Sequence, residues 1–207
     1  MKSNKLLKAA LLISGSLIWS SQASAVPMTA VTISGGSVQN TSIDTVIGWE
    51  FTALQDITVT SLGLWDEGAD GFNNRGNEVG LWATDGTLLS STAVSSVDSL
   101  ANGFRFADVF DFTLTGGMNY IVGALLQAPD QYRYSATITD SAGVAWVDSR
   151  AVNSNSLTFP TGFTGSQGSW FGANFQYKTA QVPEPSTIAL FGLGLLGMGF
   201  MRRRQIR

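Results

Sequence analysis

The sequence predicts an all-β fold, an antiparallel β-sandwich of jelly-roll-like type, from three observations. Apolar and polar side chains alternate at a period of two along short segments of the central region. Turn signals such as Asp85-Gly86, Asn102-Gly103 and Gly116-Gly117 separate these segments at a spacing of roughly ten residues. No central segment has a helical period. Short strands at this spacing are typical of sandwiches and related antiparallel folds.

Two segments show the alternation most clearly. Ile47, Trp49 and Phe51 share one side of the first segment, which predicts a strand with a buried face. The second segment predicts one long bent strand, or two strands joined near Asp108, because five large apolar residues have the same parity: Phe104, Phe106, Phe110, Phe112 and Leu114. Further strands are expected at 28–34, 56–65, 78–84, 87–94, 119–126, 132–139, 143–148 and 170–177.

Three local features refine this prediction. The apolar parity switches within residues 56–65, which predicts a bulge near Ser61. Residues 62–65 (LGLW) are echoed by residues 79–82 (VGLW), which suggests two neighbouring strands in similar environments. Residues 153–169 are rich in Asn, Ser, Gly and Thr, and are expected to form a long surface loop.

Residues 1–25 have the three parts of a secretory signal peptide. Lysines at positions 2, 5 and 8 make the start basic, an apolar stretch follows from 9 to 19, and the segment ends in Ala23-Ser24-Ala25. Signal peptidase requires small residues such as Ala23 and Ala25 before its cleavage point. The mature chain is therefore expected to begin at Val26 and to be exported across the inner membrane.

Residues 26–180 are expected to form a single domain, since their number suits one core. They include 5 basic and 14 acidic residues, so the net charge of the domain is near −9. This charge excludes nucleic acid as a partner and favours divalent cations or neutral glycans. The chain has no cysteine, so the exported domain must be stabilised by its core. It has no histidine, which excludes histidine-based acid–base catalysis.

The tail, residues 181–207, joins a Pro-Glu-Pro triplet (Pro183, Glu184 and Pro185) to an apolar helix and a basic end. Even with Ser186 included, the predicted membrane helix 187–201 would span only roughly 24 Å, against about 30 Å of hydrocarbon in a bilayer. The basic end should stay cytoplasmic. It consists of Arg202, Arg203 and Arg204, followed by Arg207. An ordinary membrane anchor is the alternative, and a glycolipid anchor signal fits worse because of the arginines.

These residues closely resemble the PEP-CTERM sorting signal of Gram-negative bacteria. The resemblance implies that an exosortase, a membrane cysteine protease, reads the triplet and removes the helix. It also implies transient anchoring in the inner membrane, followed by transfer to the cell surface or to the extracellular matrix of a biofilm. The order of motifs from Gly48 to Leu126 (GWEF, ITVTSLGLWD, NEVGLWATDGTLLSS, GFRF, NYIVGALL) is similar to an exported β-domain family of unassigned function found beside such signals.

The loop 66–78 concentrates side chains with oxygen ligands. Calcium prefers six to eight oxygens, and several could come from Asp66, Asp70, Asn73, Asn77 and Glu78. The spacing departs from that of an EF-hand, and strands rather than helices flank the loop. A solvated loop that uses Asp, Asn and Gly for its turns is the alternative interpretation.

Trp65, Trp82 and Trp170 are candidates for stacking on sugar rings. Trp82 and Trp170 lie on the more polar side of their strands and are expected to face outward, while Trp65 stands at the entry to the acidic loop. Trp49 is expected in the core. For each of these tryptophans, packing in the core is the alternative to a glycan contact.

No motif of a catalytic type is present, such as a nucleophile elbow, a P-loop or a dinucleotide fingerprint. A glycosidase needs only two carboxylates at a defined separation, so the following acidic residues keep that possibility open: Asp66, Glu67, Asp70, Glu78, Asp108 and Asp111. The sequence favours a non-enzymatic exported protein with a structural or adhesive role beside exopolysaccharide. The alternatives are a carboxylate-dependent polysaccharide-modifying enzyme and a self-assembling surface subunit.

Overall fold

The computed structural model describes residues 25–72, 77–163 and 170–179. Within these ranges the chain forms sixteen strands and one short 3-10 helix, η1 (Glu67–Ala69), and every strand pair is antiparallel. The all-β antiparallel prediction is therefore confirmed. The signal peptide up to Ser24 and the predicted helix 187–201 lie outside the described residues.

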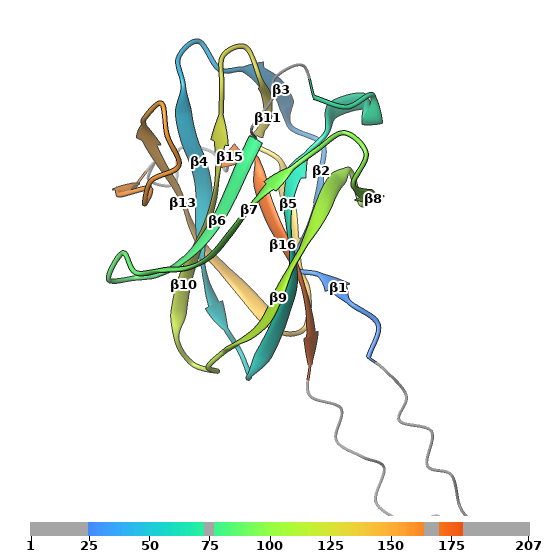
Figure 1. Ribbon diagram of the computed structural model, residues 1–207, viewed down its shortest axis with the longest axis vertical. Helices are drawn as coiled ribbons and strands as arrows, with labels where there is room; N and C mark the ends of the chain where they lie inside the picture. The colour runs from blue at the N-terminus through green and yellow to red at the C-terminus, as the bar shows by residue number, and fades with distance from the viewer. Residues whose placement is uncertain (1–24, 73–76, 164–169, 180–207) are drawn as a thin grey trace, which may run out of the picture.

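Two main sheets form the body of the domain (Figure 1). The five-stranded sheet has, in order, β1 (Met28–Thr29), β16 (Ala173–Thr179), β5 (Ile57–Trp65), β9 (Phe104–Leu114) and β8 (Ser99–Ala101). The six-stranded sheet has, in order, β14 (Gly162–Phe163), β13 (Val144–Asn153), β4 (Thr45–Ala53), β10 (Asn119–Leu126), β6 (Asn77–Ala83) and β7 (Leu88–Val94).

Two smaller sheets complete the fold. One consists of β15 (Trp170–Phe171), β11 (Gln131–Tyr134) and β3 (Ser37–Asn40), and the other of β12 (Thr137–Asp140) and β2 (Val31–Ser34). Several predicted strands are split in two, because Ala30, Ser135 and Gly172 interrupt the pairing. β3, β8 and β14 were not predicted, since strands of two to four residues have too few positions to show a period.

The core lies between the two main sheets. Trp49 and Phe51 of β4 pack against Phe175 of β16, with ring centroids 5.9 and 4.8 Å apart. The Nε1 of Trp49 donates a hydrogen bond to the carbonyl of Ala173 at 2.8 Å, so the indole is buried with its polar atom satisfied. The prediction that Trp49 belongs to the core is confirmed, because its exposed fraction is 0%.

A double irregularity divides β5 and β9. The register of β5 shifts between Val59 and Ser61, which confirms the predicted bulge. On β9, three residues, 109–111, oppose the single residue between Val59 and Ser61, so the face of β9 changes there. The prediction of one shared side for the five apolar residues of β9 is therefore wrong. Leu114 is in the core, whereas Phe110, inside the bulge, is 98% exposed.

The predicted turns have three different outcomes. Asn102 and Gly103 both have positive φ and form the two-residue turn of the β8–β9 hairpin, as expected. The turn at Asp85-Gly86 is a three-residue loop, in which Ala83 bonds Thr87 and Gly86 takes a φ of 90°. Residues 116–117 connect β9 to β10, which belong to different sheets, so no hairpin forms there.

The outer face of the six-stranded sheet carries a row of three glycines. Gly123 of β10 pairs with Gly48 of β4 on one side and with Gly80 of β6 on the other. Residues 154–163 cover this row: a Cβ placed on Gly123 would lie 3.3 Å from Cγ of Pro160. Pro160 is buried, so this part of the expected surface loop packs against the sheet, while residues 153, 155, 156 and 158 are exposed and residues 164–169 lie outside the described ranges.

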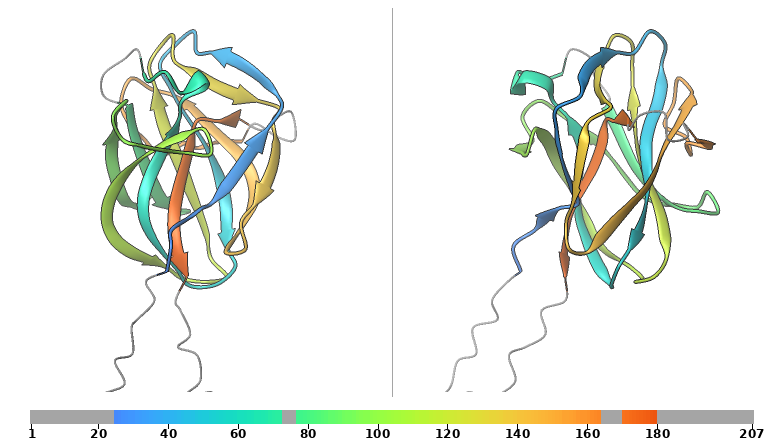
Figure 2. Two further views of the ribbon diagram at one scale, coloured as in Figure 1. Left: turned by 90° about the vertical axis from the view of Figure 1, so that its right-hand side faces the viewer. Right: turned by 180° about the vertical axis from the view of Figure 1, so that it is seen from behind.

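The ends of the described chain meet at one end of the sandwich. The pairing of Thr179 with Ile57 and of Ala173 with Leu64 orients β16 along β5. Figures 1 and 2 show that β16 ends at the side where β1 begins, while η1 and β3 lie at the opposite end of the sandwich. The sorting tail therefore follows a strand that ends far from η1.

Candidate functional site

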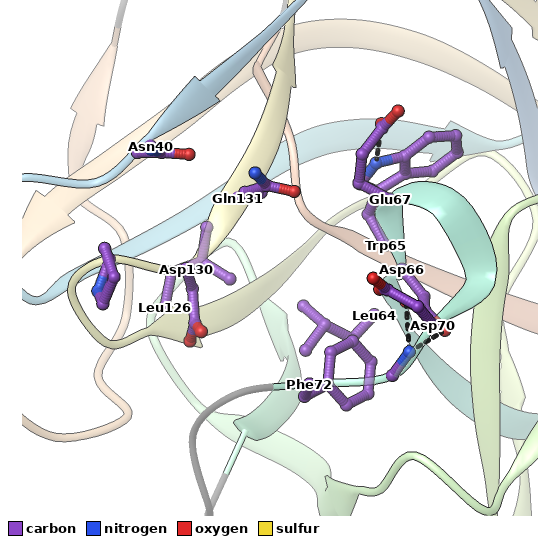
Figure 3. A pocket seen from close by; sticks show the side chains of 12 residues that line it. Asn40, Leu64, Trp65, Asp66, Glu67, Asp70, Phe72, Leu126, Asp130 and Gln131 are labelled. Carbon is purple, nitrogen blue, oxygen red and sulfur yellow. Dashed lines mark hydrogen bonds between the residues drawn. The ribbon is translucent and has the colours of Figure 1, made fainter.

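A pocket of about 260 Å³ opens at the η1 end of the sandwich (Figure 3). Three segments contribute to it: the end of β5 with η1, the β10–β11 turn, and the end of β3. The lining residues are Asn40, Leu64, Trp65, Asp66, Glu67, Asp70, Gly71, Phe72, Leu126, Pro129, Asp130 and Gln131. They combine apolar surface with amide and carboxylate groups, and they include neither lysine nor arginine.

Asp66 holds the shape of the η1 segment. Its side chain is fully buried, and its Oδ2 lies 2.6 Å from Nε of Arg105. Both carboxylate oxygens also accept a hydrogen bond from the N–H of Gly71, at 3.0 and 3.2 Å. Arg105 further donates to the carbonyls of Asp98 and Ala69. Because this network occupies the Asp66 oxygens, we assign Asp66 a structural role at the floor of the pocket.

Trp65, Glu67 and Arg133 form a second network at the rim. The Nε1 of Trp65 donates to Oε2 of Glu67 at 3.0 Å. Arg133 donates to both Glu67 oxygens, at 2.9 and 2.8 Å, and its guanidinium carbon lies 5.3 Å from the centroid of the Trp65 ring. Phe104 meets the same indole edge-on at 5.0 Å. Trp65 is therefore a half-buried, fixed aromatic wall of the pocket.

Three polar side chains of the pocket remain uncommitted among the described residues. Asn40, Asp70 and Gln131 are exposed, and none of their side chains takes part in a hydrogen bond or ion pair of the described structure. Asp130 differs, since it is 9% exposed and its Oδ2 accepts a hydrogen bond from the N–H of Gln127 at 3.0 Å. Asn40, Asp70 and Gln131 are the groups available for a ligand.

The described members of the predicted calcium set have different surroundings. Asp66 is engaged by Arg105, whereas Asp70 and Glu78 are exposed. Asn77 is 1% exposed, and neither of its amide atoms has a hydrogen-bond partner among the described residues. Asn73 lies outside the described residues. Within the described ranges, no group of three or more acidic side chains is placed to hold a metal ion. The complete five-residue calcium set stays a prediction.

Trp82 does not face solvent, so the expectation for this residue is wrong. Its exposed fraction is 3%. A Cβ on Gly80 would stand 2.5 Å from the Trp82 ring, so the indole packs closely against this glycine, and Phe159 meets it edge-on at 6.3 Å. The side chain does point outward from the sheet, but residues 154–163 cover it.

Trp170 is half-buried beside two tyrosines. Its ring centroid lies 6.1 Å from that of Tyr132 and 6.5 Å from that of Tyr134. Burial raises the pKa of Tyr132 above its ordinary value, with a smaller contribution from Tyr134. Trp170 does not line the pocket, so its contact with glycan stays a prediction separate from that of Trp65.

Sequence reasoning missed Asn40, Asp130, Gln131 and Arg133 as members of this region. These residues lie 25 or more positions from the η1 segment in sequence, and the pairing of Gln131 with Asn40 brings β3 and β11 together. Only the turn residues Pro129 and Asp130 gave a local signal, and it was a signal for chain reversal.

The described residues form an all-β domain, and the tail follows this domain in the sequence. Residues 181–205 match the family model of the PEP-CTERM protein-sorting motif. The chain thus carries the PEP-CTERM sorting motif, which supports export and sorting by an exosortase. No curated protein and no solved structure gives a significant match, and the resemblance of residues 48–126 to a β-domain family stays a prediction.

The residues of the sorting motif and of the signal cleavage point lie outside the described ranges, apart from Ala25. These are Pro183, Glu184, Pro185, Arg202, Arg203 and Arg204 in the tail, and Ala23 before the mature start. Among the residues that the structure describes, no helix has the length and apolar character needed to cross a membrane.

Proposed function

We propose that this protein is a non-enzymatic structural or adhesive component of the cell surface or extracellular matrix, and that its pocket binds exopolysaccharide. The observation that carries the proposal is the combination of uncommitted polar groups with a fixed aromatic wall. Asn40, Asp70 and Gln131 could exchange hydrogen bonds with sugar hydroxyls, while Trp65 and Phe72 provide apolar contact for a ring.

The charge of the pocket restricts the class of glycan. The lining contains four acidic residues and neither lysine nor arginine, and the whole domain is near −9. Polysaccharides rich in uronate, sulfate or phosphate would be repelled. A neutral glycan, or one that carries free amino groups, is the expected ligand.

The position of the pocket supports an adhesive role. β16 ends at Thr179, at the opposite end of the sandwich from η1, and the sorting tail follows it. A domain held through this tail would present the pocket away from the membrane. Binding at the free end and attachment at the other are the requirements of an adhesin.

The enzyme alternative has less support. A carboxylate pair needs two groups free to act on a glycosidic bond. In the pocket, Asp66 and Glu67 are each held by an arginine, and Asp130 accepts a backbone hydrogen bond. Their established contacts favour a structural role for these three carboxylates.

The proposal is tested with the full chain and the Asn40→Ala/Gln131→Ala double variant. Retention is measured by affinity electrophoresis in gels that contain the exopolysaccharide of the producing cells, a neutral polysaccharide or a polyuronate. We expect the double variant to bind at least about tenfold more weakly, since each lost hydrogen bond contributes about 1 kcal/mol. The matched control is Gln55→Ala, an exposed amide between β4 and β5 at the far end.

Retention of the wild type and the control, with loss in the double variant, supports the proposal. Equal retention of all three proteins, or no retention of the wild type, overturns it. Release of new reducing ends from the polysaccharide during incubation would favour the enzyme alternative instead.

A further inference from the structure

The edges of the two main sheets differ in their protection against pairing with another chain. An unpaired edge strand exposes backbone N–H and C=O groups, and proteins usually shorten, bulge or charge such strands. β1, β8 and β14 are edge strands of only two or three residues. β9 extends beyond β8, but its bulge at 109–111 and the exposed Asp108 and Asp111 interrupt this edge.

β7 lacks most of these protections. It is the terminal strand of the six-stranded sheet, it has seven residues, and its sequence LLSSTAV contains neither a charged residue nor a proline. A register shift opposite Leu81 and Trp82 affects only its beginning, so residues 90–94 are regular. Among the described residues, only β6 forms hydrogen bonds with the backbone of β7.

The side chains of β7 indicate that this edge is open. Leu88 and Leu89 are 49% and 39% exposed, although both are large and apolar. Thr92 pairs with the core residue Val79 and points toward the same side, yet it is only half-buried. β9 of the other main sheet approaches β7 across the sandwich, but among the described residues it forms no backbone hydrogen bond with β7.

We propose that β7 pairs with β7 of a second copy of this chain, antiparallel and about a two-fold axis. Self-pairing fits this strand because a two-fold axis places each residue against one of the same uncharged set. The pairing would satisfy the free backbone groups and join two six-stranded sheets into one. A charged partner strand would find no opposite charge on β7, whereas a second copy presents the same uncharged and partly apolar surface, including the exposed Leu88 and Leu89.

The symmetry fixes the arrangement of the dimer. Rotation by 180° about the sheet normal reverses the direction of every strand in the second copy. The two pockets would then lie at opposite ends of the dimer, as would the two Thr179 ends. Two copies tethered side by side in one membrane have the same orientation, so the dimer requires at least one copy that the tail no longer holds.

The absence of cysteine makes a direct test possible. Single variants Ser91→Cys and Ala93→Cys of the full chain are expressed in cells that contain the exosortase, mildly oxidised, and examined on non-reducing gels. If the two-fold axis passes beside residue 91 or residue 93, that residue faces its own copy, and the single variant crosslinks with itself. If the axis passes beside Thr92, residue 91 of one copy faces residue 93 of the other, so only a mixture of the two variants crosslinks. The matched control is Thr113→Cys, an exposed position on the part of β9 that extends beyond β8.

A second measurement uses sedimentation of the purified chain. Ser91→Lys is expected to raise the dimer dissociation constant at least tenfold, and Thr113→Lys to leave it unchanged, while circular dichroism confirms folding. Asn40→Ala/Gln131→Ala should dimerise normally, because the proposal does not depend on the glycan pocket. A monomer at all concentrations, crosslinking at residue 113 alone, or an assembly unaffected by Ser91→Lys would overturn the proposal.

Discussion

Two tryptophans of this domain have similar local sequences and similar packing partners, but they differ in solvent exposure. Trp65 on β5 and Trp82 on β6 close the echoed segments LGLW and VGLW, and each side chain points outward from its sheet. Each indole packs on a glycine, Gly103 or Gly80, and each meets one phenylalanine edge-on. Trp82 is 3% exposed, whereas Trp65 is half-buried at the rim of the pocket.

The segments that pack over the two tryptophans explain their different exposure. Residues 154–163 fold over Trp82 with Phe159 and Pro160. Trp65 is approached instead by the charged pair of Arg133 and Glu67, whose side chains are 23% and 26% exposed. The local motif therefore decides where a tryptophan points, and a segment distant in sequence decides whether solvent or a ligand can reach it.

The largest expected difference concerns the ion pair beside each tryptophan. Arg150 and Glu50 share the outer face of the six-stranded sheet with Trp82, and their side chains are only 10% and 8% exposed. Asn119 also donates to Glu50, at 2.8 Å. Arg150→Met would leave a buried carboxylate without its arginine and should cost about 3–5 kcal/mol of unfolding free energy.

Arg133→Met provides the comparison, since its pair is partly hydrated and should contribute about 1 kcal/mol or less. Urea unfolding, monitored by circular dichroism, gives both values. Equal losses in the two variants would show that the two ion pairs are equally buried in solution and would break the comparison.

A smaller difference is expected for the tryptophans themselves. Trp82→Ala opens a cavity under residues 154–163 and should cost about 3–5 kcal/mol. Trp65→Ala should cost about 2 kcal/mol, because part of its surface is already hydrated. Denaturant midpoints measure both effects, and affinity electrophoresis should show weaker glycan retention only for Trp65→Ala at temperatures where both variants are folded. Loss of retention in folded Trp82→Ala would contradict the separation of the two regions.

The smallest effect is expected in the β6–β7 turn, which borders the covered region. The N–H of Thr87 donates to Asp85 at 2.9 Å, and this hydrogen bond holds the pKa of Asp85 below its ordinary value of 3.8. The associated stability is present above the pKa of the unfolded chain, and is lost as the pH falls through the lowered folded pKa.

Asp85→Asn should therefore lower Tm slightly at pH 7, and the difference from the wild type should vanish at about pH 2. Thermal unfolding across this range measures it. Asp111→Asn serves as the control, since no hydrogen bond to its carboxylate is present in the described structure. A Tm difference for Asp85→Asn that persists at the lowest pH would show that the effect does not come from the ionised Asp85 carboxylate and its hydrogen bond with Thr87.

The period-two pattern was sufficient to predict the main strands, the core position of Trp49 and the bulge near Ser61. It failed for β9, where it predicted a single buried side. The alternation within β9 could not reveal that residues 109–111 oppose a single position of β5, so that the buried side changes there. The echo of LGLW in VGLW suggested that the two segments form neighbouring strands, but β5 and β6 belong to different sheets. The pocket escaped prediction because η1, β3 and the β10–β11 turn meet only through tertiary pairing. Local periodicity carries no information about such meetings.

The placement of pocket and tail at opposite ends has a mechanical consequence. A pull on a bound polysaccharide would act against an attachment beyond Thr179, along a line close to the direction of β16 and β5. Seven residues of β16 pair with β5, and a load in this direction shears their hydrogen bonds together instead of opening them one after another. A domain loaded in this way withstands more force than one whose edge strand is peeled.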